Sequence, residues 1–222
     1  MKARIFVAMG ILFLSASYAR ADAIPYPNVG TPITTNTDVT ATTNSPLVLA
    51  YYYGFSAADT DYLMVFDTNT GLFLSSDPGD SQAPANIDFF VNQTTTVGSS
   101  LPLYGATTGD RLQLELYNMS TGMTLTSDPA NDPDDPGVSH AYTTWYTTSV
   151  NGIPAPGVFV GMEDLTSGPP ENSDFDYNDD QYVLSGVAPA PEPSSLVLLG
   201  TGLLGLAFVL FKKNKPASLT LR

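Results

Sequence analysis

The chain has 222 residues, with eight Lys and Arg against 22 Asp and Glu, and it contains no cysteine. Disulfides are therefore excluded, and with His140 as the single histidine a zinc site is not expected. All 22 acidic residues lie between Asp22 and Glu192, where Arg111 is the single Lys or Arg, so this part carries a net charge near −21. Such a polyanion is not expected to bind nucleic acid, because affinity for the phosphate backbone comes from Lys and Arg.

The first 21 residues have the parts of a secretory signal peptide. Lys2 and Arg4 precede an apolar run at 5–14, and overlapping small-x-small triplets follow within 19–23. A basic start, a short apolar middle and a small-residue exit are typical of a cleaved signal rather than a membrane anchor. We expect signal peptidase to remove residues 1–21 and the remainder to be exported.

Residues 22–187 predict one all-β domain. Along 111–116, Leu112, Leu114 and Leu116 alternate with three polar residues, Arg111, Gln113 and Glu115. A period of two indicates a half-buried antiparallel strand whose polar face lies in water. No segment here shows helical periodicity, and 18 Gly and 18 Pro punctuate the chain, so we expect an antiparallel β-sandwich. The other strands are expected at 47–55, 63–66, 158–162 and 181–187, after a linker or irregular first strand at 26–46.

A sequence repeat strengthens the all-β interpretation. Residues 63–78 read LMVFDTNTGLFLSSDP, and 51 positions later residues 114–129 read LELYNMSTGMTLTSDP. Each copy predicts a β-hairpin whose turn ends in Gly. We expect the two hairpins to lie on facing sheets, and their apolar residues to point into one core: Leu63, Val65, Leu74, Leu114, Leu116 and Leu125.

The acidic loops are the strongest candidates for chemistry. Asp174, Asp176 and Asn178 alternate along one turn, a spacing that directs several oxygens towards one point. Calcium takes six to eight oxygens at about 2.3–2.6 Å, from carboxylates and carbonyls. We predict a Ca²⁺ site, and the alternative is a set of solvated acidic turns. The candidate ligands are Glu163, Asp164, Asp174, Asp176, Asn178 and Asp179, while Asp59 and Asp61 either join this site or form another.

This stretch is not an EF-hand, because its sixth position is Asp179 rather than Gly and its twelfth is Ser185 rather than Glu. The order Glu163-Asp164-Leu165, then Asp-x-Asp-Tyr-Asn-Asp at 174–179, resembles the ending of the DUF4114-type domain of bacterial surface proteins. The resemblance covers 158–187 and implies a calcium-associated β-sandwich with no agreed activity.

Catalysis is not expected. A Ser-His-Asp triad would have to use His140, and no Gly-x-Ser-x-Gly motif is present, so a secreted hydrolase is the third choice. A carbohydrate-binding module for exopolysaccharide is the stronger alternative, because Tyr51–Tyr53 and Tyr142, Trp145 and Tyr146 could stack on sugar rings. Strand alternation is expected to bury at least half of these aromatic residues.

The last part of the chain, 188–222, predicts a membrane anchor. Pro191, Glu192 and Pro193 precede an uncharged apolar run at 196–211, and Lys212, Lys213 and Lys215 follow it. A helix of these 16 residues is about 24 Å long, and Ser194 and Ser195 extend it to about 27 Å, which is just enough for a hydrocarbon core of about 30 Å. Lysines after the span keep that end in the cytoplasm. We therefore predict one C-terminal transmembrane helix.

The same residues resemble the PEP-CTERM sorting domain, also called the ice-binding protein C-terminal domain, of exported proteins in Gram-negative bacteria. The resemblance covers about 189–215 and implies transient anchoring in the inner membrane, followed by exosortase cleavage near Pro191-Glu192-Pro193. Together, these patterns predict an exported, calcium-stabilised surface or biofilm-matrix protein with a structural or adhesive role.

Overall fold

The computed structural model describes residues 28–77, 90–170, 172–189 and 200–206. The chain divides at Pro189 into two units, each of which is described by itself. The predicted signal peptide, residues 1–21, lies outside the described residues, as do Pro191, Glu192 and Pro193 and the lysines Lys212, Lys213 and Lys215.

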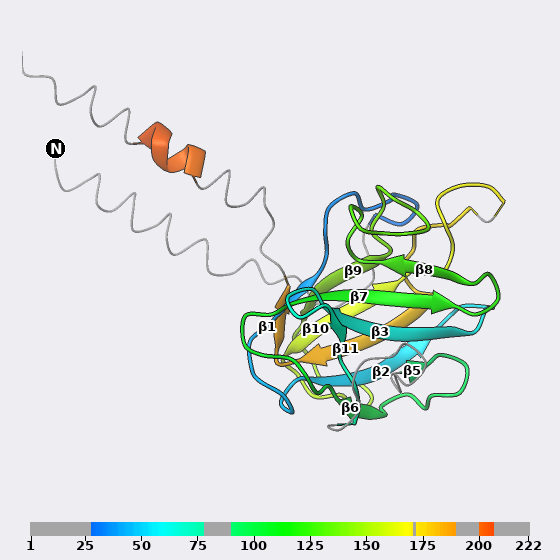
Figure 1. The fold of residues 1–222 in the computed structure, drawn as a ribbon, viewed down its shortest axis with the longest axis horizontal. Helices are drawn as coiled ribbons and strands as arrows, with labels where there is room; N and C mark the ends of the chain where they lie inside the picture. The colour runs from blue at the N-terminus through cyan, green and yellow to red at the C-terminus, as the bar shows by residue number, and fades with distance from the viewer. Residues whose placement is uncertain (1–27, 78–89, 171, 190–199, 207–222) are drawn as a thin grey trace, which may run out of the picture. The chain divides into compact units, whose positions relative to one another are not determined.

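The first unit consists of two antiparallel β-sheets (Figure 1). One sheet has seven strands: β1 (Val39–Ala41), β3 (Asp61–Asp67), β4 (Leu72–Phe73), β5 (Phe90–Val91), β7 (Arg111–Asn118), β8 (Met123–Thr126) and β12 (Val187–Pro189). Its order is β12-β1-β7-β3-β4, with β5 paired to β3 and β8 to β7. The other sheet, in the order β6-β2-β11-β10-β9, contains β2 (Leu49–Phe55), β6 (Ser100–Pro102), β9 (Ala141–Tyr146), β10 (Gly157–Met162) and β11 (Asp180–Ser185).

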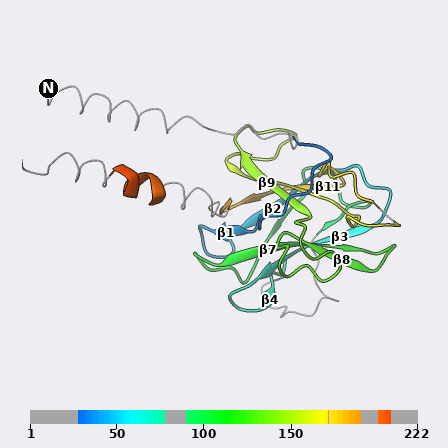
Figure 2. The ribbon, with the colours of Figure 1, turned by 90° about the horizontal axis from the view of Figure 1, so that it is seen from above.

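The two sheets form two layers around one apolar core (Figure 2). The seven-stranded sheet contributes Leu63, Val65, Leu112, Leu114 and Leu116, and the five-stranded sheet contributes Ala50, Tyr52, Val158, Val160, Tyr182 and Leu184. The all-β, antiparallel prediction is therefore confirmed, and the shared core is the arrangement expected of a sandwich.

The repeat forms two hairpins, as predicted, but their placement on facing sheets is wrong. β3 pairs with β4 and β7 with β8, yet β3 and β7 also pair with each other, with Leu63 opposite Leu116 and Val65 opposite Leu114. Both copies have the same alternation of apolar residues. When their first strands pair side by side in one sheet, both sets of leucines point into the same core.

The prediction of a wet polar face on β7 is also wrong for two of its three residues. Gln113 and Glu115 are buried, and the Gln113 side-chain amide donates to Glu115 Oε1 over 3.1 Å. Glu115 lies opposite Thr126 of β8, whose N–H donates to Asp132 Oδ2. Asp132, in the loop after β8, also acts electrostatically on Glu115, so this loop lies close to that residue.

Gly186 marks the point where the chain passes from one sheet to the other, between β11 and β12. Its φ is +75°, and a Cβ there would lie 2.5 Å from Thr43 Oγ1 and 2.7 Å from the Leu47 carbonyl oxygen. Only glycine suits such a backbone angle and so close an approach. The single strand expected at 181–187 is therefore two strands in different sheets.

The second unit is described only at residues 200–206, which are helical. No helix among the described residues has the length and apolar character that crossing a membrane requires.

Candidate metal centre

The candidate site begins with Glu163, which directly follows β10 and is fully buried. Its carboxylate accepts hydrogen bonds from the Ser173 hydroxyl and from the N–H groups of Phe175 and Tyr177. Burial raises the pKa of Glu163 to about 7, although the Ser173 hydrogen bond opposes the shift. One buried carboxylate therefore organises the loop that leads to β11.

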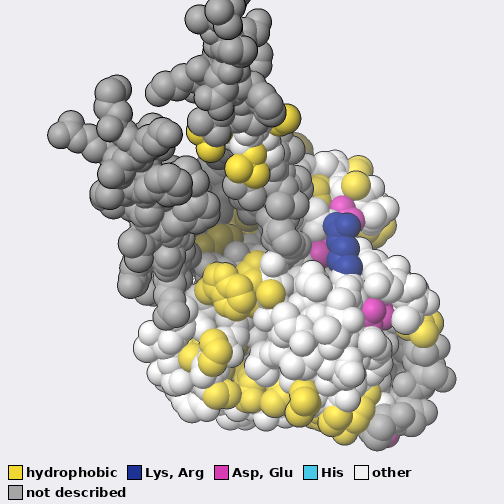
Figure 3. Space-filling model, turned by 90° about the vertical axis from the view of Figure 1, so that its left-hand side faces the viewer, with side chains coloured by type: hydrophobic (Ala, Val, Ile, Leu, Met, Phe, Trp, Pro, Cys, Tyr) yellow, Lys and Arg dark blue, Asp and Glu magenta, His cyan; other side chains and the backbone are white. Residues whose placement is uncertain are grey.

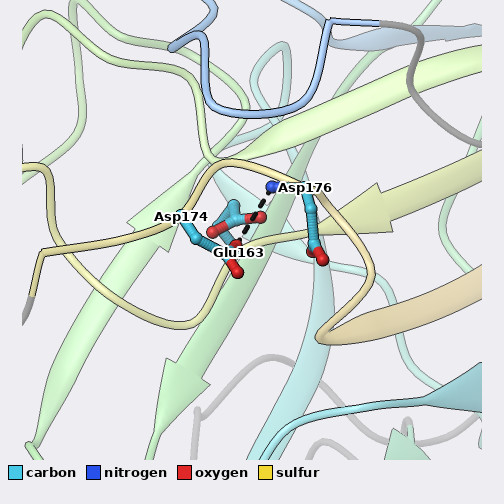
Figure 4. A group of neighbouring side chains, drawn as sticks. All are labelled: Glu163, Asp174 and Asp176. Atoms are coloured by element: carbon cyan, nitrogen blue, oxygen red, sulfur yellow. Dashed lines mark hydrogen bonds between the residues drawn. The ribbon is translucent and has the colours of Figure 1, made fainter.

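Asp174 and Asp176 complete a group of three carboxylates (Figure 4). One carboxylate oxygen from each of Glu163, Asp174 and Asp176 lies within 4.8 Å of the others. Two oxygens that bind the same calcium at about 2.3–2.6 Å can be at most about 5 Å apart, so the group fits a single ion. Asp174 is exposed and Asp176 partly buried, which leaves the group open to solvent on one side.

Hydrogen bonds from backbone N–H groups orient the alternating side chains of this loop. The N–H of Asp176 donates to Asp174 Oδ1 over 3.2 Å, and the N–H of Asn178 donates to Asp176 Oδ1 over 3.1 Å. The Asn178 side-chain amide also donates to Asp176 Oδ2. Asn178 therefore lies beside the three carboxylates and orients one of them. Burial raises the pKa of Asp176, and the charge of Asp174 adds to the shift.

Buried aromatic residues hold this loop in place. Phe175 and Tyr177 are buried in a small cluster with Ile33, Val138 and Tyr142. The Tyr177 hydroxyl donates to the Ser139 carbonyl over 3.1 Å and accepts from the Ile33 N–H over 3.0 Å. Phe175 and Tyr177 have φ values of 51° and 55°, in the left-handed region that non-glycine residues seldom adopt. Such angles concentrate at ligand sites, where surrounding contacts enforce them.

The other predicted ligands lie elsewhere. Asp179 Oδ2 accepts the N–H of Asp164 over 3.1 Å, and Asp59 Oδ2 accepts from the Asn118 side-chain amide over 3.1 Å. Asp61 is fully buried beside Asp180, within hydrogen-bonding reach of it. Glu163, Asp174 and Asp176 thus come together, with Asn178 beside them. Asp59, Asp61 and Asp164 form a second acidic group with Asp179, whose charge also acts on Glu163.

Burial is the main cause of raised pKa values for Asp61, Asp164 and Asp180 in this second group, and neighbouring carboxylate charges raise them further. Two of its members, Asp180 and Asn92, were not identified as site residues from the sequence. Asp180 forms part of the acidic run 174–180, but Asn92 follows the two-residue strand β5 and has no motif around it.

Other charged groups are engaged in local contacts. Arg111, the single Lys or Arg among the described residues, donates from Nε to Asp38 Oδ2 over 2.7 Å. Figure 3 shows basic side-chain atoms, in dark blue, beside acidic ones, in magenta, on a surface that is otherwise mostly white and yellow. His140 is buried directly before β9, with Nε2 3.1 Å from Asp135 Oδ2, and burial lowers its pKa. Asp132 Oδ1 accepts the N–H groups of Asp134 and Asp135, so that acidic loop forms a hydrogen-bonded turn.

Comparison with known protein families finds a PEP-CTERM protein-sorting motif at residues 189–213. Neither the curated proteins nor the solved structures contain a match to this chain. The match includes Pro191-Glu192-Pro193 and the apolar run at 196–211. The motif implies export of the chain and its membrane-linked processing by an exosortase.

Proposed function

We propose that this chain is a sorted extracellular protein whose β domain binds Ca²⁺ through Glu163, Asp174 and Asp176 and serves a structural or adhesive, non-catalytic role. Its place of action is the cell surface or an extracellular polymer matrix, reached after signal peptidase and exosortase processing. The observation that carries the calcium assignment is the approach of three carboxylate oxygens to within 4.8 Å. The resemblance of 158–187 to the DUF4114-type ending favours the same assignment.

The charge of the domain supports a bound cation. Between Asp22 and Glu192 one arginine faces 22 acidic residues, and that arginine already pairs with Asp38. Mutual repulsion of this size weakens a compact fold, and bound divalent ions relieve it. Calcium suits the site better than magnesium, because magnesium retains most of its water and demands strict octahedral geometry.

The test is thermal unfolding of the exported protein in calcium, compared with sodium at matched ionic strength and then with magnesium. Extracellular sites bind calcium at about 10⁻⁴–10⁻³ M, so millimolar calcium should stabilise the native state by on the order of 1 kcal/mol. Asp176→Asn should remove most of this gain. Asp77→Asn removes one charge from an exposed position in the first repeat and should leave the gain intact. Equal melting temperatures in calcium and in matched sodium would reject the site.

A carbohydrate-binding role is the second candidate, and the exposure of Trp145 favours it. Trp145 lies on the edge strand β9 and is 44% exposed. Tyr51 and Tyr53 are only half-buried, in a cluster with Phe159, whereas Tyr52 and Tyr146 are buried. Binding of the protein to a glycan array, and its loss in Trp145→Ala, would support this role over a purely structural one.

A further inference from the structure

Two buried acids meet where the two sheets adjoin. Asp61 begins β3 of the seven-stranded sheet and Asp180 begins β11 of the five-stranded sheet, and neither side chain is exposed. The Asn92 side-chain amide donates to both, at 2.8 Å from Asp61 Oδ2 and 3.4 Å from Asp180 Oδ2. The two carboxyl groups also lie within hydrogen-bonding reach of each other. Carboxylates from different sheets thus share one small buried space.

Further negative charge surrounds this pair. Asp164 and Asp179 are close enough to act electrostatically on Asp180, and Asp179 also acts on Asp61. Among the described residues no Lys or Arg is available to neutralise them, because Arg111 pairs with Asp38 and Asp128. Buried carboxylates of like charge are very unfavourable unless a cation or a proton compensates them.

Two oxygen atoms of the pair lack a donor. Asp61 Oδ1 and Asp180 Oδ1 are buried and accept no hydrogen bond from the described residues. Asp67, at the other end of β3, is equally buried, but its oxygens accept from the Asn69 N–H over 2.8 Å and the Thr70 hydroxyl over 2.7 Å. Buried polar atoms of native proteins nearly always have partners. Two buried carboxyl oxygens without a donor at one place therefore point to a positively charged ligand.

We propose that Asp61 and Asp180 bind a divalent cation of the calcium class that joins β3 to β11. Carboxylate oxygens are the donors that a hard cation prefers, and neither sulfur nor imidazole is part of this group. Calcium accepts an irregular shell, so main-chain or water oxygens can complete the coordination of two carboxylates. A shared proton would remove one charge from the four carboxylates, whereas a divalent cation removes two.

Asp61 and Asp180 share no ligand with the group of Glu163, Asp174 and Asp176, so each site can be removed by its own substitution. We call Asp61 and Asp180 the buried site, and Glu163, Asp174 and Asp176 the outer site. An ion in the buried site would affect the folding of the domain differently from an ion in the outer site. Because Asp61 and Asp180 come from different sheets, binding would stabilise the packing of the two layers. The native state would then reach full stability only where free calcium is plentiful.

The experiment counts ions bound to the exported protein after chelation and dialysis against calcium, by native mass spectrometry and equilibrium dialysis. We expect two Ca²⁺ per chain for the wild type. Asp180→Asn and Asp61→Asn should each bind one, and Asp176→Asn should also bind one. Asp67→Asn is the matched control, because it changes a buried carboxylate on the same strand whose oxygens already have donors; it should still bind two.

The outcomes separate the two sites. A wild type with one ion that is lost in Asp176→Asn and kept in Asp180→Asn overturns the buried site and leaves the outer site standing. The reverse pattern rejects the outer site and supports the buried one. Two ions retained in both Asp61→Asn and Asp180→Asn also overturn the proposal, as does a wild type that binds none and shares a proton instead. If neither Asp61→Asn nor Asp180→Asn folds, the ion counts of the wild type and of Asp176→Asn decide the question: two and one support the buried site, whereas one and none overturn it.

Discussion

Gly161 of β10 lies directly against the main chain of Tyr177, and a Cβ at position 161 would come within 2.2 Å of the Tyr177 carbonyl oxygen. The acidic loop can rest on this strand only because position 161 has no side chain. The contact explains how Asp174 and Asp176, which flank buried Phe175, are brought back to Glu163 at the end of the same strand.

Gly161→Ala should therefore displace the acidic loop without disturbing the core. A clash with main-chain atoms cannot be relieved by a side-chain rotation, so we expect a loss of about 1–3 kcal/mol in the free energy of unfolding. The calcium-specific rise in melting temperature should shrink with it. Gly168→Ala is the control, because a Cβ there meets nothing within 4 Å. An unchanged calcium response in Gly161→Ala would show that the loop does not need this contact.

Leu114 tests the pairing of the two repeats. It is fully buried on β7, opposite Val65 of β3. Leu114→Ala should lower the free energy of unfolding by about 2–5 kcal/mol in urea denaturation at fixed calcium. Met119→Ala, at a position 49% exposed just after β7, should cost less than about 0.5 kcal/mol. Similar losses for both variants would contradict the assigned core face.

Substitution of Arg111 tests its ion pair with the fully buried Asp38. Its Nε donates to Asp38, which is fully buried and also accepts from Ser127 Oγ. If water were the only partner of Arg111, Arg111→Ala would cost less than about 0.5 kcal/mol. The structure supports about 1–3 kcal/mol, because a buried carboxylate loses its partner. A double-mutant cycle with Asp38→Asn measures the coupling, and a coupling near zero would show that the pair is not stabilising.

Local sequence patterns predicted the individual strands and hairpins well. The features that depend on contacts between distant parts of the chain could not be predicted. The alternation along 111–116 and the turn glycines Gly71 and Gly122 belong to single hairpins, so short windows of sequence identify them. Which strands become neighbours depends on residues distant in the chain, so the side-by-side pairing of β3 and β7 could not be read from the repeat. The short strand β5 has too few residues to show a period.

The candidate site shows the same limit. Asp174 and Asp176 are close in sequence, and their spacing identified them together with Glu163. Asp61 and Asp180 meet only because β3 and β11 begin at the same place in space, and Asn92, which directly follows β5, donates to both. Gln113 and Glu115 were expected in water because alternation along one strand does not show what packs against its polar face, and both are buried.

Glu115 should give the domain a measurable dependence of stability on pH. Burial raises its pKa to about 7, and the charges of Asp132 and Asp38 add to the shift. The folded state then binds this proton more tightly than the unfolded state does, so the free energy of unfolding falls as pH rises from about 4.5 to about 7. Above that range the cost is on the order of 3 kcal/mol.

Glu115→Gln keeps the acceptor for Gln113 and removes the charge, so the variant should be more stable than wild type at pH 8 and equal to it near pH 4. Urea unfolding at several pH values measures the difference between the two proteins. Because the other buried carboxylates are common to both proteins, most of their contribution to the pH dependence cancels in this difference. A difference that does not vary with pH would show that folding does not change the pKa of Glu115.

The sorting motif makes a prediction about the whole chain. It covers 189–213 and implies processing by an exosortase, whose recognition we assign to Pro191, Glu192 and Pro193. In the native host, replacing these three residues with alanine should leave full-length protein in the inner-membrane fraction, because the anchor remains while cleavage fails. Deleting 196–222 should instead give a soluble exported protein, since the predicted anchor is absent. Cell fractionation and immunoblotting measure both. Release and shortening of the alanine variant at the wild-type rate would mean that cleavage does not depend on these residues, and the sorting assignment would have to move elsewhere in the motif.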